Sequence, residues 1–214
     1  GENFTYNFTN PGVYEVKLTV IDSILPLVND ALVNFEFFDG SSIDEAGTFS
    51  SLTSSEELIF VNGKDGDIQG AIELDSQSYS AAGSSGTISD FSLSYWYKGG
   101  NAQGLMSIGA EPSFGYSGLS GSNHVLNGNN ISAGSASTIQ NGTWNHLAIT
   151  VNATSGNAIS YLNGVQVSST ILAYNGMIAD QLIINELLNS NGSIDKIRIF
   201  GSELNAAEVM DLAS

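Results

Sequence analysis

Apolar and polar side chains alternate along short stretches of most of this chain, a pattern typical of β-strands. The clearest stretch has one face formed by Phe91, Leu93, Tyr95 and Tyr97 and the opposite face formed by Ser92, Ser94 and Trp96. Residues 144–151 alternate in the same way. From about residue 31 onward, Gly, Asn and Ser interrupt such stretches at intervals of roughly 8 to 12 residues, which favours a sandwich or barrel of short strands.

Turn and capping signals predict two further elements. Asn163-Gly164 lies in the middle of the alternating residues 159–167, and this dipeptide favours a type I′ hairpin because both central residues of that turn need positive φ. Asn205 precedes residues 206–212, which carry a Glu at the third helical position and apolar side chains beyond it. This pattern predicts a capped short helix near the C-terminal end.

The first 22 residues read as a separate unit. Residues 4–20 alternate on both sides of Asn10-Pro11-Gly12, which predicts a β-hairpin that is too short to bury a core of its own. The string from Tyr6 to Val20 resembles the closing hairpin of a PKD domain, an immunoglobulin-like spacer of secreted bacterial enzymes and adhesins. We therefore predict a PKD-like fragment over 1–22, a linker over 23–30 and one main domain over 31–214.

Charge and composition exclude several classes of partner. Lys and Arg number 5 against 22 Asp and Glu, a formal net charge of −17, and phosphate-backbone binding needs clustered cations instead. Nucleic acid and anionic membranes are therefore poor partners. The chain has no cysteine, so disulfides and thiol chemistry are ruled out. It also has no apolar run of the 18 or more residues that a membrane helix requires, which argues against membrane insertion.

Two acidic segments raise the question of a metal. The stretch 39–47 follows an apolar run and carries Asp39, Asp44 and Glu45, and Ca²⁺ takes about six to eight oxygen ligands. The alternative is a polar turn with side-chain caps. Residues 61–67 superficially resemble an alternating-oxygen calcium loop, but the distal bidentate Glu is missing, so the sequence favours a solvated turn there.

The order of the apolar and glycine-containing segments resembles that of the concanavalin A-like, laminin-G-like (LamG) domains of bacterial surface proteins. The segments that carry the resemblance are 32–47, 70–74, 91–98, 142–148, 161–164 and 192–200. The resemblance covers residues 31–214 and implies an all-β fold. The expected architecture is a two-sheet antiparallel jelly-roll sandwich with adjacent first and last strands.

The resemblance also implies a structural calcium. Adjacent first and last strands would bring Asp39 close to Asp195, and Asp44 with loop carbonyls would complete the ligand shell. We therefore expect calcium bound by Asp39, Asp44 and Asp195. The alternative for Asp195 is a pair with Arg198 or a turn cap, which contributes only about 0–1 kcal/mol when exposed.

We expect a non-catalytic carbohydrate-binding or adhesion module, located outside the cell or on its surface within a larger secreted protein. Its partners would be a polysaccharide or glycoconjugate and the neighbouring domains of that protein. Sugar sites combine aromatic rings with polar side chains on loops of a rigid scaffold. Six candidate ligand-binding residues fit this description, although each aromatic ring could instead be packed in the core: Trp96, Phe114, Tyr116, Asn123, His124 and Tyr174.

Two alternatives remain open at the level of function. A retaining glycosidase needs two carboxyl groups about 5–5.5 Å apart, and the Glu-x-Asp-x-x-Glu run of the enzymes that the resemblance suggests is absent. A lyase acting on uronates would need a basic cluster, which 5 Lys and Arg hardly supply. We therefore expect no enzyme activity. A structural spacer or protein-interaction domain without glycan specificity is the second hypothesis.

Overall fold

The computed structural model describes residues 25–214 except 76, 85, 101, 110–113, 119–121, 127–128, 135–141 and 175. The predicted PKD-like fragment over 1–22 lies outside these residues. The segment predicted as a linker contains a short helix, α1 (Leu25–Asn29). Two of its side chains, Leu27 and Val28, pack against the main domain. No helix in the described part is long and apolar enough to span a membrane.

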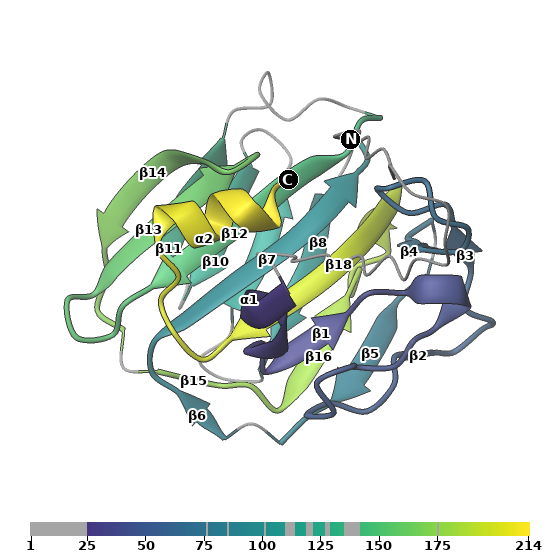
Figure 1. Cartoon of the computed structure of the whole chain (residues 1–214), viewed down its shortest axis with the longest axis horizontal. Coiled ribbons are helices and arrows are strands. Elements are labelled where there is room, and N and C mark those ends of the chain that lie inside the picture. The colour runs from purple at the N-terminus through teal and green to yellow at the C-terminus, as the bar shows by residue number, and fades with distance from the viewer. Residues whose placement is uncertain are drawn as a thin grey trace, which may run out of the picture.

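Two antiparallel sheets form the main domain (Figure 1). The sheet that faces the viewer, called the front sheet, runs β14 (Val165–Ile171), β13 (Asn157–Leu162), β12 (Asn145–Val151), β7 (Phe91–Lys98), β18 (Ser193–Phe200), β4 (Ala71–Glu73), β3 (Phe60–Val61), with β1 (Val33–Phe35) also paired to β18. The back sheet runs β11 (Asn129–Gly134), β10 (Ser122–Leu126), β9 (Phe114–Gly118), β8 (Ala102–Ile108), β16 (Gln181–Ile184), β5 (Tyr79–Ala82), β2 (Thr53–Ser54), with β17 (Asn189–Ser190) paired to β8. A separate pair joins β6 (Thr87–Ile88) to β15 (Met177–Ile178).

The main core lies between the two sheets and follows the predicted alternation. Every second residue of β7, from Phe91 to Tyr97, belongs to this core, as does every second residue of β12 from Leu147 to Val151. The back sheet contributes apolar side chains such as Leu182 and Ile184. Each fully buried side chain of this kind stabilises the fold by about 1.5–3 kcal/mol.

The outer face of the front sheet is covered as well. Residues 92, 94 and 96 of β7 are buried, although alternation alone places them on the face away from the core. A second apolar cluster on this face gathers Ala148, Tyr161 and Phe200 beneath α2 (Ala206–Leu212). Figure 1 shows α1 and α2 in front of this sheet. Helices that lie on one face of an antiparallel sheet are a common way to bury that face.

Local signals in the sequence are confirmed where they are strongest. Asn163 and Gly164 have φ of 50° and 77°, and they join β13 to β14 through the expected hairpin. Asn205 accepts hydrogen bonds from the first turn of α2, and Glu208 completes a capping box, a feature worth about 1 kcal/mol. The first described strand, β1, pairs with the last, β18. The all-β, two-sheet antiparallel sandwich with a short C-terminal helix is therefore confirmed.

Candidate functional site

The strand β18 changes its neighbour along one edge, and this change creates an irregular point in the front sheet. Residues 193–194 pair with β4, whereas residues 197–199 pair with β1. On the other edge, the register against β7 shifts between Asp195 and Arg198, and Lys196 has a φ of 50°. A β-bulge of this kind bends the strand and re-aims its side chains. The side chains of Asp195 and Lys196 therefore do not follow the regular alternation between the two faces of the sheet.

Asp195 is fully buried beside this bulge and faces a second acidic residue. Its Oδ2 accepts a hydrogen bond from the Lys64 amide at 2.9 Å. Within the described part, Oδ1 of Asp195 and Oδ1 of Asp67 are buried and have no hydrogen-bond partner. A Cβ added at Gly63 would lie 2.6 Å from Asp67 Oδ1 and 3.0 Å from Asp195 Oδ2. The two carboxylates therefore border the same small space beside Gly63.

The electrostatics of this pair fit a cation. Burial raises the pKa of Asp195 to about 7; the Lys64 amide and the charge of Lys196 lower it, and Asp67 raises it further. Buried carboxylate oxygens without partners are costly, and Ca²⁺ prefers oxygen ligands. No three acidic or histidine side chains gather to hold a metal in the described part. Backbone oxygens or water would therefore complete the shell around Asp67 and Asp195.

The predicted metal set of Asp39, Asp44 and Asp195 needs correction, because the structure does not bring the three carboxylates together. Asp44 is buried, and its oxygens accept backbone N–H groups of Asn34, Ala46, Thr48 and Phe49 at 2.7–3.1 Å. It organises its own loop. Asp39 is exposed in the short 3₁₀ turn η1 (Phe38–Gly40). The alternative pair of Asp195 with Arg198 is also absent, since Arg198 pairs with Glu36.

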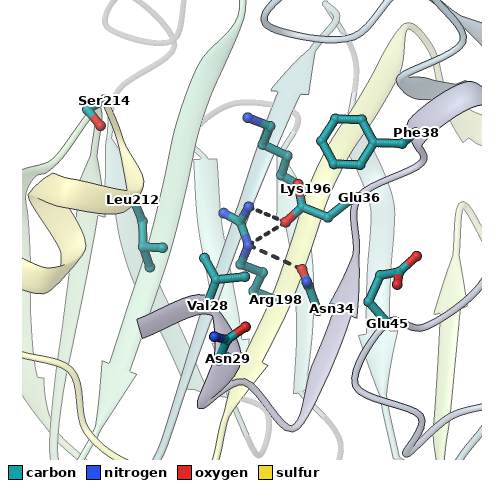
Figure 2. A pocket seen from close by; sticks show the side chains of 10 residues that line it. All are labelled: Val28, Asn29, Asn34, Glu36, Phe38, Glu45, Lys196, Arg198, Leu212 and Ser214. Carbon is teal, nitrogen blue, oxygen red and sulfur yellow. Dashed lines mark hydrogen bonds and ion pairs between the residues drawn. The ribbon is translucent and has the colours of Figure 1, made fainter. Parts of the chain in front are cut away.

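A cavity of about 490 Å³ opens next to the bulge, between α1, β1, β18 and the end of α2 (Figure 2). Its floor carries three buried polar residues, Asn34, Glu36 and Arg198. Arg198 Nε donates to Asn34 Oδ1 at 3.2 Å and to Glu36 Oε1 at 3.0 Å, and Nη2 also donates to Glu36 Oε1. Planar pairing of guanidinium with carboxylate fixes both groups in orientation.

The rim of the cavity is more open. Phe38 is 55% exposed, Glu45 is exposed, and Lys196 is half-buried and paired with Asp65 of the 61–67 loop. Figure 2 shows Phe38 and Leu212 on opposite sides of the pair on the floor. The cavity thus combines apolar walls with a fixed set of donors and acceptors, the usual make-up of a small-molecule site.

Three of the six predicted ligand-binding residues are packed inside the protein. Trp96 is 7% exposed, with Lys64 Nζ 4.4 Å from its ring centroid. His124 is fully buried and bonds Ser160 Oγ at 3.0 Å through Nδ1. The buried Tyr174 donates its hydroxyl to Ile88 O. A ligand on the surface cannot stack on these rings, so the prediction is wrong for Trp96, His124 and Tyr174.

The other three predicted ligand-binding residues lie in the back sheet. Phe114 and Tyr116 are on β9, and their side chains lie outside the described part. Asn123 is half-buried on β10. Asn123 does not line the cavity. The sequence analysis did not predict the residues that line the cavity. The polar residues of β1 and β18 come together only when the first and last strands of the domain pair with each other.

Comparisons with known proteins agree with this architecture. Residues 74–210 match the family described as the concanavalin A-like lectin/glucanases superfamily, Laminin_G_3. Domain 4 of AbnA, an extracellular GH43 arabinanase from Geobacillus stearothermophilus, solved in complex with arabinotriose, is similar in structure, with a TM-score of 0.61 and 22% identity. The similarity covers 86% of this chain and 98% of that chain. The comparison with curated proteins found no match.

Two toxin binding domains are similar over half of their length. The binding domain of Paraclostridial Mosquitocidal Protein 1 has a TM-score of 0.69 and 19% identity, covering 87% of this chain and 52% of that chain. The botulinum neurotoxin serotype D domain in complex with N-acetylneuraminic acid has a TM-score of 0.69 and 15% identity, covering 89% and 52%. The two toxin structures are binding domains, and the arabinanase domain was solved with arabinotriose. The family match spans more than half of the sequence, and the chain belongs to the concanavalin A-like lectin/glucanase superfamily.

Proposed function

We propose that this domain is a non-catalytic carbohydrate-binding module that works outside the cell, within a larger secreted or surface protein. The observation that carries the proposal is the structural similarity to domain 4 of the AbnA arabinanase. This similarity covers 98% of that domain. The toxin domains weigh less, because the likeness leaves about half of each of them unmatched. The Asp67–Asp195 pair is not placed for hydrolysis, since Asp195 is fully buried and a sugar cannot reach it.

The direct test is a glycan array probed with the purified chain, followed by calorimetry on the glycans retained. The array should include arabinotriose, sialylated glycans and neutral polysaccharide fragments. We expect binding to at least one neutral class with a dissociation constant in the micromolar to millimolar range. A folded chain that retains no glycan would overturn the proposal and favour the spacer hypothesis.

We further propose that a hard cation, with Ca²⁺ as the first choice, binds at Asp67 and Asp195. The supporting observations are that each carboxylate has one buried oxygen without a partner and that both carboxylates lie beside Gly63. The cation would neutralise both carboxylates and attach the 61–67 loop to β18. This role is structural, and it replaces the ligand set predicted from sequence with one that uses Asp67.

Thermal unfolding with Ca²⁺ and with chelator tests the cation. At about a hundred times its dissociation constant, Ca²⁺ adds roughly 2.7 kcal/mol to the free energy of unfolding, which corresponds to about 5–10 °C in Tm for a domain of this size. Asp195→Asn and Asp67→Asn should abolish the shift. The exposed Asp180→Asn is the matched control and should keep it. An unchanged Tm in the native chain would count against the site.

A spectroscopic readout separates metal binding from stability. Trp96 lies directly opposite Asp195 in the pairing of β7 with β18. Tb³⁺ bound at Asp195 should therefore emit when Trp96 is excited, and Ca²⁺ should compete the emission away. Trp96→Phe should reduce the emission, whereas Trp144→Phe should leave most of it.

A further inference from the structure

We infer that the cavity between α1, β1, β18 and α2 is the saccharide-binding site and that it takes the end of a neutral glycan. The inference rests on the proposed function and names its site. The cavity volume of about 490 Å³ lies within the range of about 300–1,000 Å³ that is usual for small-molecule sites. Of the residues that the sequence suggested for sugar binding, none whose side chain the structure describes lines this cavity.

The floor of the cavity offers both donors and acceptors. Glu36 Oε1 accepts both bonds from Arg198, so Glu36 Oε2 has no partner among the described residues. The same holds for Arg198 Nη1 and Asn34 Nδ2, because the recorded bonds use Nε, Nη2 and the Asn34 oxygen. None of these three atoms is both buried and without a partner, so each keeps some exposed surface on a residue that lines the cavity.

This arrangement suits a pair of neighbouring hydroxyl groups. Every sugar hydroxyl can both donate and accept, and two such groups on adjacent carbons need a donor beside an acceptor at fixed spacing. Glu36 and Arg198 supply that combination, and their mutual ion pair holds it in place before a ligand arrives. Polar groups that are oriented in advance lower the entropic cost of binding.

The charges around the cavity favour a neutral ligand over an acidic one. Both cations already have carboxylate partners, Arg198 with Glu36 and Lys196 with Asp65. Glu45 adds a further carboxylate at the rim, and the chain as a whole carries a net charge of −17. A sialic acid or uronate would meet like charge without a free cation in the described part of the site.

The backbone beside the cavity holds an aromatic ring in the open. Phe37 and Asp39, on either side of Phe38, have φ of 57° and 52°. Such conformations cost about 1–2 kcal/mol per residue, and they often gather at ligand sites. They turn Phe38 out to 55% exposure while Phe37 stays in the core. An exposed ring at the edge of a polar cavity is a suitable platform for the apolar face of a sugar.

Calorimetric titration of the full chain with the neutral glycan retained on the array tests the site. Phe38→Ala should weaken binding about tenfold, the loss expected for one stacked ring. Glu45→Gln removes a carboxylate from the rim, so it should improve retention of acidic glycans. Both side chains are exposed, so both variants should fold, which circular dichroism would verify.

Trp144→Ala is the matched control, because Trp144 is a partly exposed ring that does not line the cavity and lies 5.9 Å from Lys98 Nζ. It should bind like the native chain. Unchanged affinity in Phe38→Ala, or a loss confined to Trp144→Ala, would overturn this site and leave the proposed function intact. A native chain that retains no glycan would overturn the proposed function and this inference with it.

Discussion

Two buried aspartates show how far one residue type can differ in role within the same fold. Asp44 is 3% exposed and Asp195 is fully buried. Asp44 accepts four backbone N–H groups, whereas Asp195 accepts one from Lys64 and keeps an oxygen without a partner. The sequence cannot tell these cases apart, because the difference lies in which amides the loop presents to each carboxylate. Asp195 is therefore the more useful residue to test.

Asp195 should make stability depend on pH when no divalent cation is present. Its folded pKa of about 7 lies above its ordinary value of 3.8, so the folded state holds the proton more tightly. The resulting stabilisation is present below about pH 4 and is lost as the pH rises to about 7. Asp195→Asn keeps a neutral side chain, and its Tm relative to the native chain should rise over this window in chelator.

His124 and His146 have the opposite effect on the pH dependence of stability, because burial lowers the pKa of each to about 3. Their contribution is present above about pH 6.5 and is lost as the pH falls. Both histidines remain in the variant, so the comparison between variant and native chain cancels them. A difference in Tm that stays constant from pH 4 to 7 would show that Asp195 does not titrate in this window.

Among the elements, the hairpin of β13 and β14 was the easiest to predict, because its turn is encoded by two adjacent residues. The same holds for α2, whose cap depends on Asn205 and Glu208 only three positions apart. β7 could also be predicted, from its alternating apolar and polar residues. Trp96 on its polar face was wrongly predicted to bind a ligand, however, because period-two alternation does not reveal that α1 and α2 cover the outside of the front sheet.

The turn between β13 and β14 also lies close to the C-terminal end of α2. Gly164→Ala would place a Cβ at 3.2 Å from Ala213 Cβ and Met210 Cα, in a backbone with φ of 77°. Gly47→Ala introduces the same kind of backbone strain, with φ of 73°, but meets no atom within 4 Å. We expect Gly47→Ala to lower the free energy of unfolding by about 1–2 kcal/mol and Gly164→Ala to cost about 1 kcal/mol more.

Urea unfolding of both variants and the native chain measures this difference, with a constant m-value as the check that the transition is unchanged. The excess cost of Gly164→Ala reports the contact of the turn with α2 alone. Equal costs for the two variants would mean that α2 moves away without loss.

At the scale of the whole molecule, the sandwich was predictable but the site was not. Short alternating strands with regular turns specify two sheets through local sequence. The site depends on pairs that are distant in sequence: Lys64 with Asp195, 131 residues apart, and Glu36 with Arg198, 162 residues apart. A single sequence carries no signal that links such positions, so neither the proximity of Asp67 to Asp195 nor the cavity was foreseen.

The position of β18 has a consequence for how the domain is made in the cell. β18 is the last strand in chain order among those described, yet it lies between β7 and the pair β4 and β1, and β1 has no other described partner. During synthesis from the ribosome, the front sheet therefore stays open until residues 193–200 emerge. Contacts over such separations also form slowly. A fragment of residues 25–192 should be digested rapidly by protease when the full chain resists, so the nascent domain would depend on chaperones until its final strand arrives.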